Sequence, residues 1–489
     1  MKIRIMTLLL FITVCSFGQT TPRNYSFNGN MSEEVLRNYL SRSMTVSGLL
    51  FGSVYYDGNA PYAEDDERMV INVGAKFVGR SIYMWGKDDN INNTSFLSQA
   101  KTKIDRMHLL DPEIIFQACI FEIVTPYVNN VTIPAYVFQA FDLPIEDRNF
   151  RYADMYNISH NGQWGGVSKG SAPDVTRIET RLWYYYLATQ YINIGIEAIH
   201  WGQVQMTAFD DQYNGYKSWF ELIGKVRDFA RIRARRKFVL NDGHTRPGIV
   251  VGGKLLLDFH SFPMRPMNIS GQPYSVQLIF SSRTMYGQSS GGTTYSGWQC
   301  THLPYIVEFD NYGISSNPGI YDSSGGWIWG YDEITWFSLQ PEADRNSFLD
   351  YAVKWIKVND PTGNLEMPGR RVVSTTTGGK IYRANTAAGN MATYGYSQES
   401  TIKQIWLDDM QSAVTAVDAD KKYSIMTNAN AITIKGGDSQ FEISLLTLNG
   451  VTIMKMIATR EATISPNQHG VFLVQVKDKT RVEVFKVVM

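Results

Sequence analysis

An alternation of apolar, strand-like segments with amphipathic, helix-like segments constrains the fold of this chain more than any other feature. The alternation runs from about residue 45 to residue 358. Strands that alternate with helices pair in parallel through right-handed crossovers. Eight strands over roughly 300 residues predict a closed (β/α)8 TIM barrel of the α/β class rather than an open sheet. The strand-like segments are 44–50, 75–86, 111–124, 196–203, 237–244, 253–262, 303–311 and 326–337.

Helix-like segments separate most of these strands. The longest of them begins at Pro173 and Asp174, residue types that favour a helix start. Strands six and seven have no helix-like segment between them, and we expect 266–300, rich in Ser, Gly and Thr, to form a long loop with strands of its own. Residues 360–410, rich in Gly and Thr, are expected to pack against the barrel. The helix-like segments are 63–74, 94–110, 173–195, 218–236 and 342–358.

Short alternating strands replace this pattern from about residue 415. Seven strands at such spacing predict a small all-β sandwich. The sequence therefore divides into a signal peptide (1–18), a barrel domain with a C-terminal extension (19–410) and a β-sandwich domain (411–489). The seven strand-like segments are 423–427, 431–436, 441–450, 451–457, 461–465, 470–478 and 481–488.

The N-terminus has the pattern of a secretory signal. Lys2 and Arg4 precede the apolar run 8–14, and small residues follow up to Gly18. This order predicts cleavage after Gly18 and a protein that is secreted, periplasmic or on the cell surface. The apolar run is too short for a permanent transmembrane helix, and no later stretch reaches that length, so we expect no stable membrane span.

Composition narrows the class of partner. The 489 residues carry a formal net charge of +0, which argues against a nucleic-acid partner, because that role needs a basic face. Aromatic residues make up 13% of the chain. Most belong in the core, but aromatic rings also line clefts that stack sugar rings. An oligo- or polysaccharide substrate is therefore favoured, and no cofactor is expected.

Polar side chains follow nearly every predicted strand. Chemistry in a (β/α)8 barrel gathers at the C-terminal strand ends, so these side chains are candidates for one site. A single acidic residue there needs no function, because strand ends meet water. Glu122 and Glu308 each follow an unbroken apolar run and are the strongest candidates. The others are Arg80, Trp85, His200, Gln203, Asp242, His244, Asp258, His260, Trp329 and Glu333.

Two carboxylates across a barrel mouth suit the cleavage of glycosidic bonds. One carboxyl group protonates the leaving oxygen, and the other, ionised, attacks the anomeric carbon or activates water. Apolar neighbours raise one pKa and a nearby cation lowers the other, which separates the two roles. We assign the proton donor to Glu122 and the nucleophile or base to Glu308, which Arg80 could approach.

The strand ends resemble the (β/α)8 glycoside hydrolases of the clan A superfamily over roughly residues 40–360. In that superfamily the nucleophile is a Glu at the end of strand seven, where this chain has YIVEFDN with Glu308. The resemblance also implies that Arg80, His260 and Trp329 match an Arg, an aromatic or His, and a Trp that recur there. The general acid of the superfamily follows an Asn on strand four, whereas this chain reads HWGQ with Gln203 at that place.

This departure leaves the general acid open between Glu122 and Asp242, and it keeps two alternatives. The first is a metal-dependent barrel enzyme with a mixed nitrogen and oxygen site. The second is a glycan-binding protein that does not cleave, since the amide of Gln203 cannot donate the proton. The metal alternative would use Glu122, His200, Asp242, His244, Asp258 and His260.

The C-terminal 70 residues or so resemble the sorting-type β-sandwich tail of secreted Bacteroidetes proteins. ISLLTLNGVTIMKM places Leu448, Asn449 and Gly450 at a turn, and Gly470 opens the strand GVFLVQV. The resemblance implies export. Whether the tail is a sorting signal or an accessory domain stays open.

Overall fold

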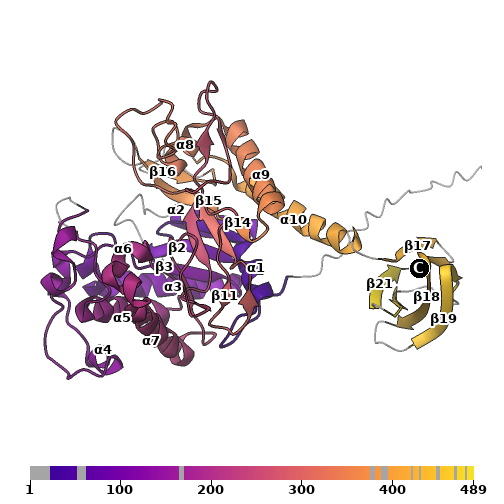
Figure 1. Cartoon of the computed structure of the whole chain (residues 1–489), viewed down its shortest axis with the longest axis horizontal. Helices are drawn as coiled ribbons and strands as arrows, with labels where there is room; N and C mark the ends of the chain where they lie inside the picture. Colours follow the sequence, from indigo (N-terminus) through magenta and orange to yellow (C-terminus); the bar gives the residue numbers. More distant parts are fainter. Residues whose placement is uncertain are drawn as a thin grey trace, which may run out of the picture. The chain divides into compact units, whose positions relative to one another are not determined.

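The computed structural model describes residues 23–51, 62–164, 170–374, 380–386, 395–419, 422–428, 431–447, 452–466, 471–479 and 482–488. The predicted signal peptide, 1–18, lies outside these residues. The chain divides into two compact units, one spanning Pro22–Trp406 and the other containing Leu407–Met489. The division falls within α10 (Glu399–Ala419). Figure 1 shows both units.

Eight parallel strands form a closed barrel in the first unit, which confirms the predicted (β/α)8 fold. They are β1 (Ser43–Val46), β2 (Phe77–Tyr83), β3 (Ile115–Cys119), β4 (Ala198–His200), β5 (Leu240–Asp242), β8 (His260–Pro263), β13 (Tyr305–Glu308) and a last strand made of β14 (Gly363–Leu365) and β15 (Met367–Val373). Strand β15 pairs with β1, and β14 pairs with β13. A parallel bridge from His244 to Ser261 joins the β5 side to β8 and completes the ring.

The eighth strand does not lie where the sequence predicted it. Segment 326–337 is a loop followed by α8 (Glu333–Leu339), and Asp332 caps this helix by accepting the N–H of Thr335 at 2.8 Å. Its tryptophans pack against the preceding loop. The true strand, β14–β15, contains Pro368 and Gly369, which weaken a strand pattern. The prediction of strand eight at 326–337 was wrong for this reason.

The sixth strand is also displaced. Most of segment 253–262 precedes the barrel strand: β7 (Lys254–Leu255) forms a short hairpin with β6 (Val250–Val251), and only the end of the segment enters β8. The apolar run of three leucines, 255–257, is therefore buried outside the barrel strand. Period alone does not separate a buried loop from a buried strand.

The predicted helices are present around the barrel. They are α2 (Tyr62–Val73), α3 (Thr94–Leu110), α5 (Ile178–Asn193), α7 (Lys217–Arg233) and α9 (Glu342–Asn359). Helices α5 and α7 pack side by side on the outside (Figure 1). The shorter helix α4 (Ala135–Ala140) lies between β3 and α5, and the shorter helix α6 (Val204–Ala208) follows β4.

The N-terminal end of the barrel is filled by apolar side chains. Helix α1 (Glu33–Leu40) and the residues before it form one apolar cluster with the first residues of several strands, among them Phe77, Ile115 and Leu240. Tyr39 is fully buried there, and its hydroxyl donates to the carbonyl of Glu113 at 2.8 Å. This plug leaves the opposite, C-terminal end of the barrel as the place for a cavity.

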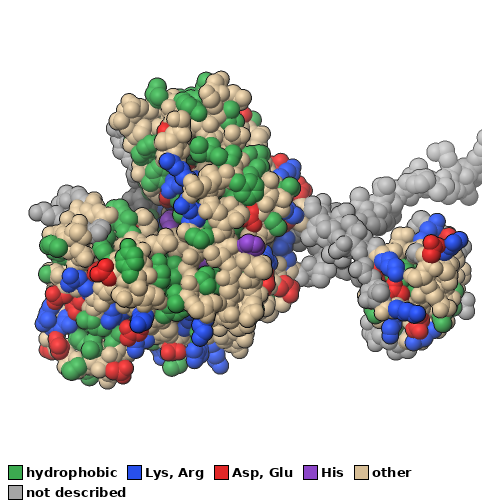
Figure 2. Space-filling view, viewed as in Figure 1, with side chains coloured by type: hydrophobic (Ala, Val, Ile, Leu, Met, Phe, Trp, Pro, Cys, Tyr) green, Lys and Arg blue, Asp and Glu red, His purple; other side chains and the backbone are tan. Residues whose placement is uncertain are grey.

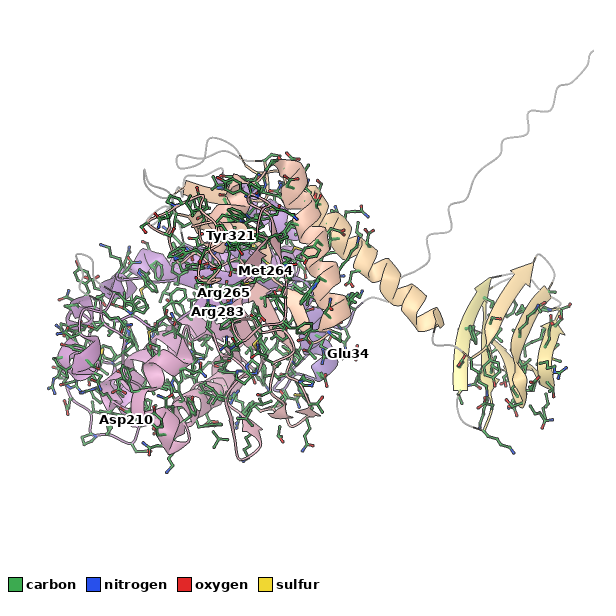
Figure 3. All side chains as sticks on the ribbon, turned by 45° about the horizontal axis from the view of Figure 1, so that its top comes forward. Glu34, Asp210, Met264, Arg265, Arg283 and Tyr321 are labelled. Atoms are coloured by element: carbon green, nitrogen blue, oxygen red, sulfur yellow. The ribbon has the colours of Figure 1, made fainter. Side chains whose placement is uncertain are left out.

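The long connection between β8 and β13 has strands of its own and no helix among its described residues, as the sequence predicted. These strands are β9 (Met267–Asn268), β10 (Val276–Gln277), β11 (Gly292–Thr293) and β12 (Gln299–Cys300). Asn268 donates to the carbonyls of Asp322 and Trp327, so this connection packs on the loop before α8. Arg283 and Tyr321, labelled in Figure 3, come from these two loops.

The second unit is an antiparallel β-sheet with its own apolar core, which confirms the predicted all-β domain. Its described residues form five strands where seven were predicted: β17 (Ser424–Asn428), β18 (Ala431–Thr447), β19 (Thr452–Ile464), β20 (Val471–Lys477) and β21 (Val482–Val488). A register shift between Lys435 and Gln440 in β18 replaces one predicted turn, and β19 runs through a second at 458–460, so each of these strands joins two predicted ones. Leu448, Asn449, Gly450 and Gly470 lie outside the described residues.

Acidic and basic side chains are interspersed on the face of the barrel unit shown in Figure 2. In the part of the chain that the structure describes, every helix is too short or too polar to cross a membrane.

Candidate active site

A cavity of about 590 Å³ opens at the C-terminal ends of the barrel strands. Its wall combines charged side chains on one part with aromatic side chains on another. The lining residues come from almost every strand of the barrel, although they are far apart in the sequence. They are Ser47, Arg80, Tyr83, Trp85, Phe121, Glu122, Trp164, His200, Gly202, Gln203, His244, Asp310, Asn311, Tyr312, Gly313, Arg371, Val372 and Ser374.

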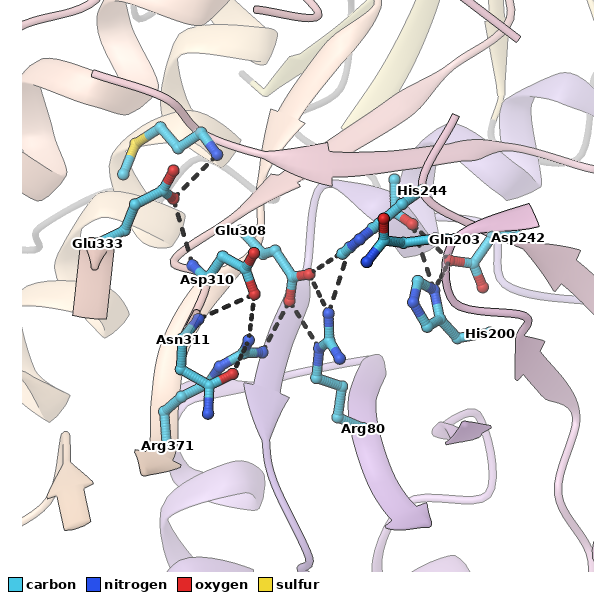
Figure 4. A network of polar contacts seen from close by, with 12 residues as sticks. Arg80, His200, Gln203, Asp242, His244, Glu308, Asp310, Asn311, Glu333 and Arg371 are labelled. Carbon is cyan, nitrogen blue, oxygen red and sulfur yellow. Dashed lines mark hydrogen bonds and ion pairs between the residues drawn. The ribbon is translucent and has the colours of Figure 1, made fainter. Parts of the chain in front are cut away.

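Glu308, the last residue of β13, lies behind this wall and is bound by three of its members. Arg80 binds both of its oxygens, with Nε donating to Oε2 at 2.8 Å. Arg371 Nη1 donates to Oε2 at 2.8 Å, and His244 Nε2 lies 2.7 Å from Oε1 (Figure 4). Burial acts to raise the pKa of Glu308, but the two guanidinium charges outweigh it and hold this pKa well below its usual range. Glu308 is therefore a buried, ionised carboxylate.

A local irregularity of β2 directs Arg80 to this position. The pairing of β2 with β3 shifts register between Val78 and Ile82, and Arg80 has a φ of 54°. Bulges of this kind re-aim a side chain, and their strain is held by the surrounding contacts. Here the N–H of Arg80 donates to Gln117 Oε1 at 3.0 Å.

A second buried glutamate lies beneath Glu308. Glu366, at the start of the last strand, has its Oε1 without a hydrogen-bond partner among the described residues. Burial, reinforced by the charge of Glu308, raises the pKa of Glu366 to about 8. Residue 79, which faces Glu366 from β2, must be glycine, because a Cβ there would lie 1.9 Å from Glu366 Oε1. Glu366 is thus held protonated at neutral pH while Glu308 is ionised.

Glu122 faces the cavity just beyond the end of β3. Its side chain is 5% exposed, and it accepts from both nitrogens of Gln203: Oε2 from the backbone N–H and Oε1 from Nε2, each at 3.0 Å. Gly202 makes this approach possible, since a Cβ there would lie 2.0 Å from Glu122 Oε2. Gln203 therefore holds the carboxyl group of Glu122, which lies three residues after the end of β3, in a fixed position.

His200 and Asp242 form a further pair at the ends of β4 and β5. His200 Nδ1 lies 2.8 Å from Asp242 Oδ2, and the His200 ring lines the cavity. The same Oδ2 accepts from Ser261 at 2.8 Å, while Oδ1 accepts from Gln117 at 2.7 Å. The centroids of the His200 and His244 rings are 4.9 Å apart. Two imidazoles, each bound to a buried carboxylate, thus lie next to each other on the wall.

An aromatic wall adjoins Glu122. Trp85 is 42% exposed, and its ring centroid lies 5.6 Å from that of Trp164 and 5.4 Å from that of Phe121. Trp164 Nε1 donates to the backbone carbonyl of Glu122 at 2.8 Å. Flat apolar faces with polar rims are the surfaces on which sugar rings stack.

The structure brings most of the predicted site residues together. Arg80, Trp85, Glu122, His200, Gln203 and His244 line the cavity, and Glu308 and Asp242 bind lining residues from behind. The prediction missed Arg371, Trp164 and Tyr312. Arg371 was missed because its strand was not recognised, although two arginines before two valines in an otherwise buried segment are an available signal.

Asp258 and His260 do not reach this cavity, so the prediction that they close strand six there was wrong. His260 is the first residue of β8 and therefore sits at the opposite end of that strand; burial lowers its pKa to about 3. Asp258 precedes the strand and pairs with Arg227 of α7 at 3.0 Å. Both side chains are part of the barrel's internal structure.

Trp329 and Glu333 are not among the lining residues, although Glu333 accepts the backbone N–H of one of them, Asp310, at 3.2 Å. Trp329 belongs to the loop before α8, and its Nε1 donates to the carbonyl of Ser275 at 3.1 Å. Glu333, the first residue of α8, accepts the backbone N–H groups of Met264 and Arg265 at 3.0 and 2.8 Å. Burial raises the pKa of Glu333 to about 7. These two residues hold loops rather than close a barrel strand.

Within the described residues, no group of three or more His, Cys, Asp or Glu side chains is arranged to hold a metal ion. The carboxylates of Asp242 and Glu308 accept hydrogen bonds from protein side chains: Asp242 from Gln117 and Ser261, and Glu308 from Arg80 and Arg371.

Comparison with known proteins shows similarity of architecture only. No family model matches the chain, and no curated protein matches it. Solved structures of TIM-barrel glycoside hydrolases are similar at low identity. Eubacterium rectale Amy13B has a TM-score of 0.41 at 10% identity, with coverage of 90% of this chain and 97% of that one. The GH27 β-L-arabinopyranosidase of Geobacillus stearothermophilus has a TM-score of 0.35 at 10% identity, with coverage of 91% and 99%.

The FMN-binding β-glucuronidase of Faecalibacterium prausnitzii L2-6 has a TM-score of 0.33 at 9% identity, and 91% of this chain matches 55% of that one. The chain thus spans about half the length of this enzyme. These TM-scores are too low for the substrates of these enzymes to say anything about the substrate of this chain.

Proposed function

We propose that this protein is an exported glycoside hydrolase that uses a pair of carboxylates at the mouth of the barrel. One observation carries the proposal. A single cavity presents Glu122 on its wall, lies against the cations that hold Glu308 ionised, and continues into the aromatic surface of Trp85 and Trp164. An acid and an anion are the two groups that glycosidic cleavage uses, and an aromatic surface can stack the sugar ring.

In this proposal Glu122 donates the proton to the leaving oxygen, and Gln203 holds the carboxyl group that does so. Glu308 supplies the negative charge, as nucleophile or base, opposite the positive charge that develops at the anomeric carbon. Arg80 and Arg371 keep Glu308 ionised. Two guanidinium groups bind Glu308, whereas Glu122 accepts from the backbone N–H and the side-chain amide of Gln203.

A second candidate, a glycan-binding protein without hydrolysis, is favoured by one feature of the same site. Glu308 is 2% exposed, and both of its oxygens already accept bonds from Arg80, Arg371 or His244. A carboxylate in this state stabilises a cavity whether or not it attacks a substrate. Binding and cleavage must therefore be measured separately.

The test is a comparison of wild-type protein with Glu308→Gln and Glu122→Gln on a panel of aryl glycosides and polysaccharides. Glu197→Gln is the matched control, because Glu197 is equally buried and binds Arg235 and Arg236, but it lies at the start of β4, away from the cavity. Circular dichroism establishes that each variant is folded. Calorimetry with the same glycans measures binding independently of cleavage.

Cleavage that both cavity variants abolish and Glu197→Gln retains would support the hydrolase. Cleavage that survives in Glu308→Gln would remove Glu308 from the mechanism. Binding of a glycan by wild-type protein with no cleavage would favour the second candidate. Export is tested by sequencing the N-terminus of protein recovered outside the cytoplasm, which is expected to begin at Gln19.

A further inference from the structure

The Asp242–His200 pair has a feature that the two proposed carboxylates do not use. His200 and Asp242 are partners in the register of β4 and β5, so their side chains leave neighbouring strands at the same level. Both oxygens of Asp242 also accept bonds from other side chains, Oδ1 from Gln117 Nε2 and Oδ2 from Ser261 Oγ. The carboxylate is thereby fixed, and it fixes the orientation of the imidazole.

This arrangement determines which nitrogen of His200 carries the proton. An ionised Asp242 can only accept, so Nδ1 of His200, 2.8 Å from Oδ2, must be the donor. Burial lowers the pKa of His200, against the opposite effect of Asp242, so the ring is neutral near neutral pH. A neutral ring that is protonated on Nδ1 has a bare Nε2, which is a hydrogen-bond acceptor.

Nε2 of His200 makes no hydrogen bond within the described part of the protein. The atom is buried, although the ring lines the cavity. Buried polar atoms in native proteins are nearly always paired with protein, water or ligand, so this atom on the cavity wall is a site for a hydrogen-bond donor from solvent or from a ligand. Phe121 packs its ring against the same imidazole, with centroids 6.0 Å apart, and adds an apolar surface beside the acceptor.

We propose that Nε2 of His200 accepts a hydrogen bond from a ring hydroxyl of a neutral sugar unit, and that Asp242 holds His200 in this accepting state. The inference rests on the proposed function in taking the ligand to be a carbohydrate. A hydroxyl suits the site better than an ammonium group, because the guanidinium groups of Arg80 and Arg371 share the same wall. His200 is thus a specificity-determining residue, which selects a sugar with a hydroxyl at one position.

Three substitutions separate the acceptor from mere packing. His200→Asn can keep a donor near the Nδ1 position for Asp242 but has no atom at the Nε2 position. His200→Gln can place its amide oxygen near the Nε2 position and so retain an acceptor. His260→Asn is the matched control, because His260 is also fully buried with an Nε2 that has no partner among the described residues, yet it lies at the other end of its strand and outside the lining.

For the aryl glycoside that wild-type protein handles best, His200→Asn is expected to lower kcat/KM, or the affinity where nothing is cleaved, roughly 10- to 100-fold. His200→Gln should recover a large part of that loss, and His260→Asn should leave the value unchanged. The analogue in which the recognised hydroxyl is replaced by hydrogen should bind wild-type protein and His200→Asn equally. Equal values for wild-type protein and His200→Asn on the hydroxylated glycoside would overturn the inference.

Nitrogen NMR of protein labelled in its histidines gives a readout that is independent of catalysis. The chain has 7 histidines, and the spectrum of His200→Asn identifies the signals of His200. The free protein should show Nδ1 protonated and Nε2 bare, and millimolar methyl glycosides should move the Nε2 signal. Asp242→Asn should remove the preference for this tautomer and weaken the glycoside response.

A charged His200, or one protonated on Nε2, in the free protein would contradict the inference. So would an Nε2 signal that no cleaved or bound glycoside moves. A different result would contradict only the hydrolase proposal. If a glycoside moves the Nε2 signal but is not cleaved, the hydrolase proposal fails and the inference about His200 stands. If no glycoside is either cleaved or bound, both fail.

Discussion

Replacement of Arg371 by Met tests whether the barrel depends on the charges around Glu308. Arg371 is 2% exposed and donates to three groups: Glu308 at 2.8 Å, Asp310 at 3.0 Å and Asn311 at 2.8 Å. Removal of one partner from a buried ion pair costs about 3–5 kcal/mol, because the other charge stays buried. Glu308 keeps Arg80 and His244, so we expect the lower end of this range, about 3 kcal/mol.

Urea unfolding followed by tryptophan fluorescence measures this loss in the barrel alone. All 11 tryptophans lie between Trp85 and Trp406, so the all-β unit does not contribute to the signal. Arg37→Met is the control, because Arg37 pairs with Glu33 at 2.7 Å on a helix face where both side chains are more than 30% exposed to solvent, 34% and 38%. Exposed pairs contribute about 0–1 kcal/mol, so the control should unfold close to wild-type protein.

The double variant Arg371→Met with Glu308→Gln isolates the interaction itself. Because the neutral amide no longer needs two cations, the combined loss should be smaller than the sum of the single losses, by about 1–3 kcal/mol. Additive losses would refute the coupling between Arg371 and Glu308. A midpoint for Arg371→Met equal to that of Arg37→Met would refute the whole electrostatic account of the site.

Three further predictions use the same unfolding assay. The folded-state pKa of Glu366, about 8, lies above that of the unfolded chain, so the stability linked to its proton is fully present at low pH and is lost as pH rises through about 8; Glu366→Gln should flatten the pH dependence of the midpoint between pH 5 and 9. Gly202→Ala places a Cβ at a φ of 60° and 2.0 Å from Glu122 Oε2, so the midpoint should fall and any cleavage should be lost. Truncation after Ala419 removes a sheet with its own apolar core, so the barrel midpoint should not move.

The elements that the sequence predicted well are those in which local pattern and tertiary role agree. Helix α3 has the predicted bounds, Thr94–Leu110, because Asn93 caps it and a single apolar stripe faces the barrel. Strand β13 lies in its predicted segment because an apolar run is bounded by a proline and by polar residues. Where both conditions hold, period and end signals suffice.

The last strand shows why other elements could not be found. Met367–Val373 contains a proline, a glycine and two arginines, and it is a strand only because β1 and the antiparallel β16 (Lys380–Arg383) lie on either side of it. Segment 326–337 has the stronger apolar pattern, yet its tryptophans serve loop packing. Burial of Arg370 and Arg371 is favourable only in the closed barrel, where Arg370 pairs with Asp66 and Arg371 pairs with Glu308. Such positions are invisible to a local pattern.

The contacts of the candidate active site also form only when the barrel closes, because they join residues from distant strands. Glu308 and Arg80 are 228 residues apart, and Arg371 reaches the same carboxylate from the strand that closes the ring. Strand β1 separates β2 from β15, so the two arginines approach Glu308 from either side of the seam where the first and last strands meet. Glu308 is therefore flanked by both guanidinium groups only when that seam is formed. Closure of the barrel assembles the cations that hold the pKa of this buried carboxylate low. The sequence could therefore nominate Glu308 and Arg80, but not Arg371, which lies on the strand that closes the ring.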